Sequence, residues 1–180
     1  MREPSSRQLT LALGSNLGNR VENLCFGVLA LAELGIRVEV LSPVFETPPL
    51  GYLHQPPFLN MVASASTDLP HRSVLTIFRS VEERAGRTRE FVNAPRTLDL
   101  DLLFFKGLIL RETGLQVPHP RWKERSFVVR PLAAISPYLR DPETGWQVHE
   151  VARYWPMEPE EIRMVLSPEA FRKALEEWKL

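Results

Sequence analysis

One strand-like stretch near the middle of the chain most constrains its fold. Residues 96–105 read Arg-Thr-Leu-Asp-Leu-Asp-Leu-Leu-Phe-Phe, so that apolar and acidic residues alternate. Side chains two positions apart on a β-strand lie on the same side, about 6–7 Å apart. The pattern predicts an apolar face made of Leu98, Leu100, Leu102 and Phe104. Asp99 and Asp101 are then expected to point together to the opposite face of this aspartate strand.

The two carboxylates have two explanations. An edge strand with a solvated face would need no ligand for them. Alternatively, they converge on divalent metal ions while Arg96 meets an anion, because buried carboxylates are costly unless something compensates them. Magnesium carrying a nucleotide triphosphate is the compensation that we favour. Their mutual repulsion further predicts that removing both charges raises stability slightly.

Composition bounds the class of protein. The 180 residues are 44% hydrophobic and 24% charged, which is typical of a globular protein. We expect a single domain over 1–180, with a flexible N-terminus at 1–8 and a C-terminal extension at 150–180. The net charge is zero, which argues against nucleic-acid and membrane partners. The absence of a long apolar run or signal peptide predicts a cytoplasmic location, and we expect a monomer that binds small molecules.

Strand-like and helix-like patterns alternate along the rest of the chain. Asn19 and Glu22 are spaced as a capping box, and the helix that they begin is expected to end at Gly35. Further helices are expected at 70–85, 122–134 and 158–178. Strands are expected at 9–13, 36–40, 58–67 and 96–105, and at 108–111 as a hairpin partner of the aspartate strand. This order predicts an α+β fold in which helices pack against an antiparallel sheet.

Two loops carry candidate ligand-binding residues. Residues 47–57 hold four prolines and one glycine, which indicates a stiff loop. Arg87 and Arg89 follow Gly86 in a second loop that leads to the aspartate strand. Guanidinium groups beside two carboxylates suit phosphoryl transfer, where metal and arginine hold the charge of the phosphates. Taken alone, however, neighbouring charged residues such as Glu82 and His119 could equally be structural.

Two other classes of protein remain possible on these residues. A two-metal nucleotidyltransferase could use the same paired aspartates, but the neutral net charge argues against it. A nucleotide- or RNA-binding module would have no use for the aspartates beyond solubility, and would favour exposed aromatic residues on its central strands.

Four motifs in order resemble one enzyme family. They are Leu-Gly-Ser-Asn-Leu-Gly at 13–18, Glu-Thr-Pro-Pro-Leu-Gly at 46–51 with Phe-Leu-Asn at 58–60, Pro-Arg-Thr-Leu-Asp-Leu-Asp at 95–101, and Val-Pro-His at 117–119. Over residues 9–150 the chain resembles 6-hydroxymethyl-7,8-dihydropterin pyrophosphokinase. The resemblance implies a ferredoxin-like fold and the transfer of pyrophosphate from ATP to the pterin hydroxymethyl group, in folate biosynthesis.

The resemblance also implies residue roles. Asp99 and Asp101 would hold two magnesium ions, and Arg87 and Arg96 would stabilise the transferring phosphorus. The residues implied to contact ATP are Leu75, Arg79, Glu82, Arg89, Arg96, Leu102, His119 and Arg125. Those implied to contact the pterin are Thr47, Pro48, Leu50, Phe58, Asn60, Asp99 and Phe127.

Three departures from the family pattern stand out. The loop 91–94 reads Phe-Val-Asn-Ala where the family usually has Arg-Trp-Gly, so an aromatic contact on ATP is either missing or supplied by Phe91. Pro120 stands where an aromatic residue often follows the histidine. The extension at 150–180 is unexplained by the resemblance, and we favour simple packing over a subunit contact for it.

Overall fold

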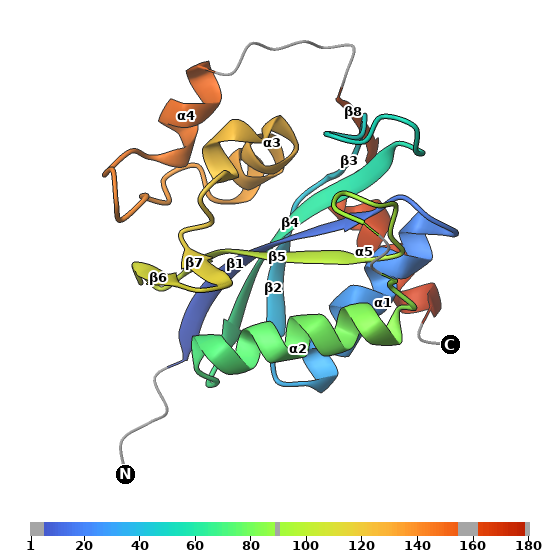
Figure 1. Cartoon of the computed structure of the whole chain (residues 1–180), viewed down its shortest axis with the longest axis horizontal. Coiled ribbons are helices and arrows are strands. Elements are labelled where there is room, and N and C mark those ends of the chain that lie inside the picture. Colours follow the sequence, from blue (N-terminus) through green and yellow to red (C-terminus); the bar gives the residue numbers. More distant parts are fainter. Residues whose placement is uncertain (1–5, 89–90, 155–161, 179–180) are drawn as a thin grey trace.

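A computed structural model describes residues 6–88, 91–154 and 162–178 of the chain. Its centre is an antiparallel sheet in the order β5-β1-β4-β3-β8, with β2 also paired to β4 (Figure 1). The strands of this sheet are β1 (Arg7–Ser15), β2 (Arg37–Leu41), β3 (Val44–Thr47), β4 (Phe58–Thr67), β5 (Asp99–Phe105) and β8 (Arg163–Leu166). The expected α+β class, an antiparallel sheet with packed helices, is confirmed.

Helices cover both faces of this sheet (Figure 1). They are α1 (Arg20–Glu33), α2 (His71–Arg84), η1 (Trp122–Glu124), α3 (Ser126–Ile135), α4 (Val148–Tyr154) and α5 (Pro168–Trp178). The predicted start of α1 is confirmed, because the Asn19 side chain accepts a hydrogen bond from the backbone N–H of Glu22. None of the helices in the described ranges is long and apolar enough to span a bilayer.

Two hydrophobic clusters lie on opposite faces of the sheet. The larger cluster joins α1, α2 and α5 to the leucines of β1, with Leu11, Leu13 and Leu24 fully buried. The smaller joins η1, α3 and α4 to Val62 and Phe104. Because α3 and α4 cover only part of the second face, polar residues near its uncovered end can meet a ligand.

The aspartate strand departs from strict alternation at one position. Leu11 pairs with Leu102 while Thr10 pairs with Phe104, so β5 has one extra residue, a β-bulge at Leu103. The three leucines at 98, 100 and 102 pack in the larger cluster as predicted. The prediction that Phe104 shares their face was wrong, because the bulge turns it to the smaller cluster, where its ring contacts Trp122.

The predicted hairpin after the aspartate strand was also wrong. Lys106 and Gly107 do form a turn with positive φ angles of 37° and 67°. However, the partner of β5 is β1, and the following segment forms a separate pair of β6 (Leu110–Glu112) with β7 (Leu115–Val117). β1 is a longer pairing partner for β5 than the short strand β6 that follows the turn.

The two ends of the chain differ from the sequence expectations. Residues 1–5 lie outside the described residues, but Arg7 and Gln8 already pair with β4, so the flexible segment cannot extend to residue 8. In the extension, the expected helix is preceded by an unexpected strand, β8, which pairs with β3. α5 then packs on α1, with Phe171 fully buried. This agrees with simple packing of the extension against its own chain.

Candidate active site

The site begins at a row of residues across the middle of the sheet. Gly14 on β1 pairs with Asn60 on β4 and with Asp99 on β5. A Cβ atom at position 14 would lie 2.8 Å from Asn60 Oδ1 and 3.8 Å from the Cβ of Asp99. The glycine therefore leaves the space in which the side chains of Asn60 and Asp99 face the same uncovered end of the sheet.

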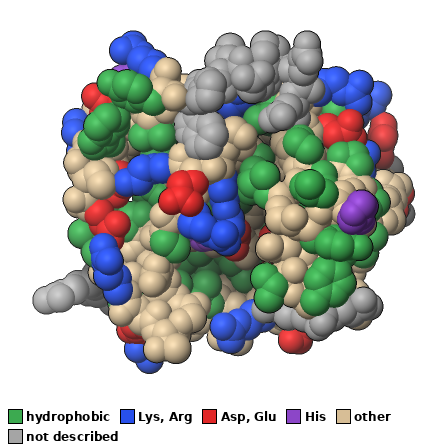
Figure 2. Space-filling model, turned by 45° about the horizontal axis from the view of Figure 1, so that its top comes forward, with side chains coloured by type: hydrophobic (Ala, Val, Ile, Leu, Met, Phe, Trp, Pro, Cys, Tyr) green, Lys and Arg blue, Asp and Glu red, His purple; other side chains and the backbone are tan. Residues whose placement is uncertain are grey.

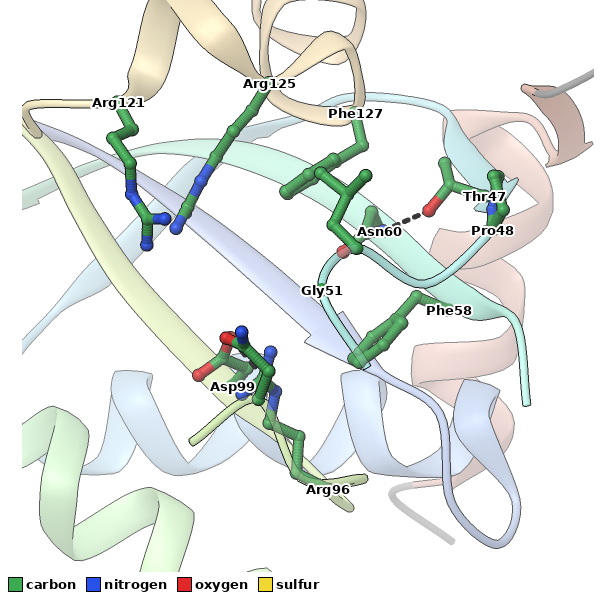
Figure 3. A pocket seen from close by; sticks show the side chains of 12 residues that line it. Thr47, Pro48, Gly51, Phe58, Asn60, Arg96, Asp99, Arg121, Arg125 and Phe127 are labelled. Atoms are coloured by element: carbon green, nitrogen blue, oxygen red, sulfur yellow. Dashed lines mark hydrogen bonds and ion pairs between the residues drawn. The ribbon is translucent and has the colours of Figure 1, made fainter. Parts of the chain in front are cut away.

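A cavity with two aromatic walls lies over this row. Phe58 and Phe127 stand on opposite sides of it, with the loop at Gly51 between them (Figure 3). We call it the aromatic cavity; its residues are Thr47, Pro48, Leu50, Gly51, Phe58, Asn60, Asn93, Arg96, Asp99, Arg121, Arg125 and Phe127. All seven residues implied to contact the pterin line it. The Asn60 amide donates to Thr47 Oγ1 at 2.7 Å, which fixes the orientation of the amide.

A second, larger cavity lies between α2 and β5. Its volume is about 560 Å³ against about 160 Å³ for the aromatic cavity. Among the residues of this α2 cleft are Leu75, Arg79, Glu82, Arg87, Asp99, Asp101, Leu102, His119 and Pro120. Asp99 lines both cavities, so the two adjoin at this carboxylate. Figure 2 shows basic and acidic side chains gathered around a hollow on the face drawn.

The expected ATP residues divide between the two cavities. Leu75, Arg79, Glu82, Leu102 and His119 line the α2 cleft. Arg96 and Arg125 instead line the aromatic cavity, where each forms an ion pair with one of the two aspartates. Arg89 lies outside the described residues, and its role stays a prediction.

Asp99 is held by two arginines. Arg87 Nη1 donates to Asp99 Oδ1 at 2.6 Å and also bonds Glu82 Oε1. Arg96 Nε lies 3.3 Å from Asp99 Oδ2, and its guanidinium lies over the ring of Phe58 at 5.2 Å. The Nε atoms of Arg87 and Arg96 are buried and make no hydrogen bond within the described ranges. Buried donors of this kind suit an anionic ligand.

Asp101 is paired with Arg125 and lies near a histidine. Arg125 Nη1 donates to Asp101 Oδ2 at 2.8 Å, and His119 Nε2 lies 3.9 Å from the same oxygen. His119 Nδ1 accepts from the backbone N–H of Arg121 at 3.1 Å. Burial lowers the pKa of His119, and this effect outweighs the opposing attraction of Asp101. A neutral ring with its proton on Nε2 fits both contacts.

The ion pairs change one expectation from the sequence. Mutual repulsion suggested that removing the charges of Asp99 and Asp101 raises stability. Instead, each carboxylate compensates at least one arginine. Removing either charge would leave a partly buried guanidinium without its partner, which costs stability.

Comparison with known proteins assigns the chain to a family. The family model described as 7,8-dihydro-6-hydroxymethylpterin-pyrophosphokinase (HPPK) matches residues 10–137. The chain belongs to the HPPK family. The resemblance inferred from the motifs is thereby confirmed.

Curated relatives of different lengths agree with this assignment. The chain is 39% identical over 147 residues to the 2-amino-4-hydroxy-6-hydroxymethyldihydropteridine pyrophosphokinase of Bacillus subtilis, covering 81% of this chain and 88% of the relative. It is 36% identical over 141 residues to the folic acid synthesis protein fol1 of Schizosaccharomyces pombe. That match covers 78% of this chain but 19% of the fungal protein, so the chain spans about a fifth of this longer relative.

A solved structure shares the fold. The wild-type Plasmodium falciparum HPPK-DHPS crystal structure has a TM-score of 0.67 at 13% identity, and the match covers 89% of this chain and 47% of that chain. At this identity the likeness concerns the fold alone. It agrees with the ferredoxin-like architecture that the resemblance implied.

Within this HPPK chain, Glu82 has an additional structural contact. Its side chain is only 6% exposed, and Oε1 accepts from the backbone N–H of Leu100 at 2.9 Å. Leu100 lies between the two aspartates on β5. Glu82 therefore fixes the backbone that carries both carboxylates, besides lining the α2 cleft.

Several site residues were missed by sequence reasoning. Asn16, in the Gly-Ser-Asn turn, accepts from the backbone N–H of Arg96 at 2.7 Å and donates to Gln55 Oε1 at 2.9 Å. It thus joins Arg96 to the loop over the aromatic cavity. Arg121, which was also missed, extends into that cavity beside Arg125, which the resemblance had implied (Figure 3). The position of Asn16 in the first shared motif was the one available signal.

The unusual loop at 91–94 contacts the proline-rich loop. The ring of Phe91 lies edge-on to Tyr52, with centroids 5.2 Å apart, and neither residue lines either cavity. The Gln55 amide also donates to the carbonyl oxygen of Asn93 at 3.2 Å. The arrangement favours the first alternative drawn from the sequence, in which the aromatic contact on ATP is missing.

The carboxylates fit a magnesium ion. Oxygen ligands suit Mg²⁺, which is usually bound by one or two carboxylates plus substrate phosphates and water. Asp99 and Asp101 are partly exposed at the junction of the cavities, where phosphates would lie. Among the residues that the structure describes, no cluster of three or more His, Cys, Asp or Glu side chains could form an all-protein cage. This donor set matches a metal that arrives with its substrate.

Proposed function

We propose that this chain transfers the pyrophosphoryl group of ATP to 6-hydroxymethyl-7,8-dihydropterin, giving AMP and the pterin diphosphate for folate synthesis. The observation that carries this proposal is the meeting of the two cavities at Asp99. A flat pterin fits between Phe58 and Phe127, and a nucleotide triphosphate fits the larger α2 cleft. The hydroxymethyl group and the phosphates would then meet beside the carboxylates.

In the transfer, the hydroxymethyl oxygen forms a bond to the β-phosphorus of ATP. The bond from that phosphorus to the oxygen bridging it to the α-phosphorus breaks, its electron pair stays on that oxygen, the hydroxyl proton passes to water, and AMP leaves. Magnesium held by Asp99 and Asp101 would neutralise phosphate charge; we propose two ions. The remaining catalysis comes from positioning the two substrates and from guanidinium charge near the phosphates.

We propose distinct roles for the arginines. Arg96 and Arg125 line the aromatic cavity beside the two aspartates, where they would stabilise the transferring phosphates. Arg87 donates to Asp99 in the free protein and would turn to the phosphates once magnesium takes the carboxylate. Arg87→Ala is expected to slow turnover more than it weakens substrate binding. The monomeric state and the cytoplasmic location that we expect from the sequence stay predictions.

The test is an assay of nucleotide products. Purified protein is incubated with ATP, magnesium and 6-hydroxymethyl-7,8-dihydropterin, and the nucleotides are separated by chromatography. AMP that forms only with pterin present supports the proposal. ADP in place of AMP would indicate transfer of a single phosphate, and folded protein that consumes no nucleotide would contradict the activity altogether.

A further inference from the structure

The C-terminal extension reaches an element that forms the aromatic cavity. The family model ends at residue 137, so β8 and α5 lie beyond it. β8 nevertheless pairs with β3, and this pairing places Arg163 opposite Glu46. β3 ends at Thr47, which lines the aromatic cavity and accepts the hydrogen bond from Asn60. A segment outside the matched family region therefore pairs with a strand that ends at the aromatic cavity.

Glu46 is bound by two arginines from distant parts of the chain. Arg20, at the start of α1, places Nη2 2.9 Å from Glu46 Oε2. Arg163, on β8, places Nη2 2.9 Å from Glu46 Oε1. The hydrogen bond from Arg20, together with that from Arg163, lowers the pKa of Glu46. Each carboxylate oxygen thus has its own guanidinium partner, and we call these three residues the Glu46 cluster.

The Glu46 cluster lies at the start of the proline-rich loop and also contacts the end of that loop. Arg20 Nη1 donates to the carbonyl oxygen of Pro57 at 2.8 Å. Pro57 is followed by Phe58, an aromatic wall of the cavity, whereas Glu46 is followed by Thr47. Arg20 therefore links the two ends of the loop 48–57, and Arg163 secures Glu46 from the outer side of β3.

We propose that the Glu46 cluster positions the pterin-binding loop, and that the C-terminal extension contributes to pterin binding through Arg163. This inference rests on the proposed function. None of the three residues lines either cavity, so they would act through Thr47 and Phe58 rather than by touching a substrate. They also lie away from the carboxylates, so pterin affinity should change while the chemical step does not.

The degree of exposure sets the size of the expected effects. Glu46 and Arg20 have side chains 23% and 28% exposed, whereas that of Arg163 is 74% exposed. An exposed ion pair contributes little, so Arg163→Gln should raise the KM for pterin by about 1.5- to fivefold. Glu46→Gln removes both pairs and should raise it by about three- to tenfold. The turnover number and the KM for ATP should stay within about twofold of wild type.

The experiment measures AMP formation first at saturating ATP with varied pterin, and then at saturating pterin with varied ATP. A double-mutant cycle is formed by wild type, Glu46→Gln, Arg163→Gln and the variant that carries both changes. Arg172→Gln is the matched control, because it removes an exposed arginine from α5 in the same extension. Thermal unfolding establishes that each variant is folded, and Arg163→Gln alone tests the extension if Glu46→Gln does not fold. The proposal expects Arg163→Gln to have no further effect in the Glu46→Gln background.

Two results would overturn the proposal. One is an unchanged KM for pterin in folded Glu46→Gln, or in Arg163→Gln if only that variant folds. The other is an effect of Arg163→Gln that persists in full when Glu46 is already replaced, since the extension would then act elsewhere. If wild type forms no AMP with pterin, the proposed function itself fails, and the role of the cluster in pterin binding fails with it.

Discussion

At the scale of single residues, Asp99 is the carboxylate at which the two cavities meet. It is shared by the aromatic cavity and the α2 cleft, and it pairs with both Arg87 and Arg96. A magnesium ion would compete with these guanidiniums for the same oxygens. In the proposed reaction, the arginines that would bind the phosphates are thus paired in the free protein with the carboxylates that would bind the metal, and these ion pairs balance the charge of the site before substrates arrive.

Replacing either aspartate by its amide tests the metal assignment. Asp99→Asn and Asp101→Asn should each lower AMP formation at least about 100-fold at saturating magnesium, because a metal stabilises the transferred charge by several kcal/mol. Neither variant should gain stability, since each leaves an arginine without its ion-pair partner. Asp68→Asn, an exposed residue paired with Arg37, is the control. Wild-type rates in either site variant would contradict the assignment.

Gly14 is predicted to be essential for the geometry of Asn60. In Gly14→Ala the new Cβ would lie 2.8 Å from Asn60 Oδ1, so the amide must move. The KM for pterin should rise, and the free energy of unfolding should fall by about 1–3 kcal/mol. Pterin titrations and urea denaturation measure the two effects. In an Asn60→Ala background the clash is gone, so a Gly14→Ala penalty that is undiminished there would refute this explanation.

At the scale of elements, the sequence predicted the site strand better than its neighbours. Asp99 and Asp101 were assigned correctly to one face because polar residues interrupt the apolar pattern there. The run Leu102 to Phe105 contains no polar residue, so nothing in it marks the bulge at Leu103. β8 was missed for another reason: it pairs with β3, a strand more than 100 residues away in the sequence, and local patterns do not encode such a pairing.

Residue identity alone could not reveal the connections made by small polar residues. Asn16 was visible as part of a motif, but its bonds to Arg96 and Gln55 join segments 80 and 39 residues away, respectively. Such contacts are set by the tertiary fold rather than by spacing along the chain. Many of the residues that line the two cavities could thus be listed from the sequence, whereas the residues that hold them in place required the structure.

The loop before α4 is predicted to depend on one buried carboxylate. Asp141 is fully buried, pairs with Lys123 at 2.6 Å and accepts from Thr144 Oγ1 and from the backbone N–H of Glu143. Burial raises its pKa, but these bonds outweigh burial and lower it overall. Asp141→Asn should reduce the free energy of unfolding at pH 7 by about 1–3 kcal/mol, with little effect on pterin or ATP binding.

The pH dependence of this stabilisation has a definite sign. A carboxyl group whose pKa is lowered by folding stabilises the native state above its unfolded pKa, about 3.9 for aspartate. That contribution is lost as the pH falls through the lower folded pKa. The stability gap between wild type and Asp141→Asn should therefore narrow below about pH 4. Denaturation curves across this range measure it, and a gap that widens with acid would contradict the role of the charge.

At the scale of the whole molecule, the extension is part of the main core rather than an appendage. Phe171 and Leu175 of α5 are buried in the larger cluster with α1, and Trp178 meets Phe26 with ring centroids 6.1 Å apart. The same extension supplies β8 to the sheet edge beside the aromatic cavity. If Arg163 positions the pterin-binding loop as proposed, stability and pterin binding are coupled through residues beyond the segment that the family model matches.

Truncating the buried ring of α5 tests whether the extension belongs to the main core. Phe171→Ala should lower the free energy of unfolding by about 3–5 kcal/mol, because it removes a fully buried aromatic side chain and leaves a cavity. Arg172→Ala, on the exposed side of the same helix, should change it by no more than about 0.5 kcal/mol. If α5 packs within its own chain, the midpoint of urea unfolding should not depend on protein concentration in wild type or variant. A midpoint that rises with concentration would mean that the helix is also a subunit contact, the alternative that the sequence left open.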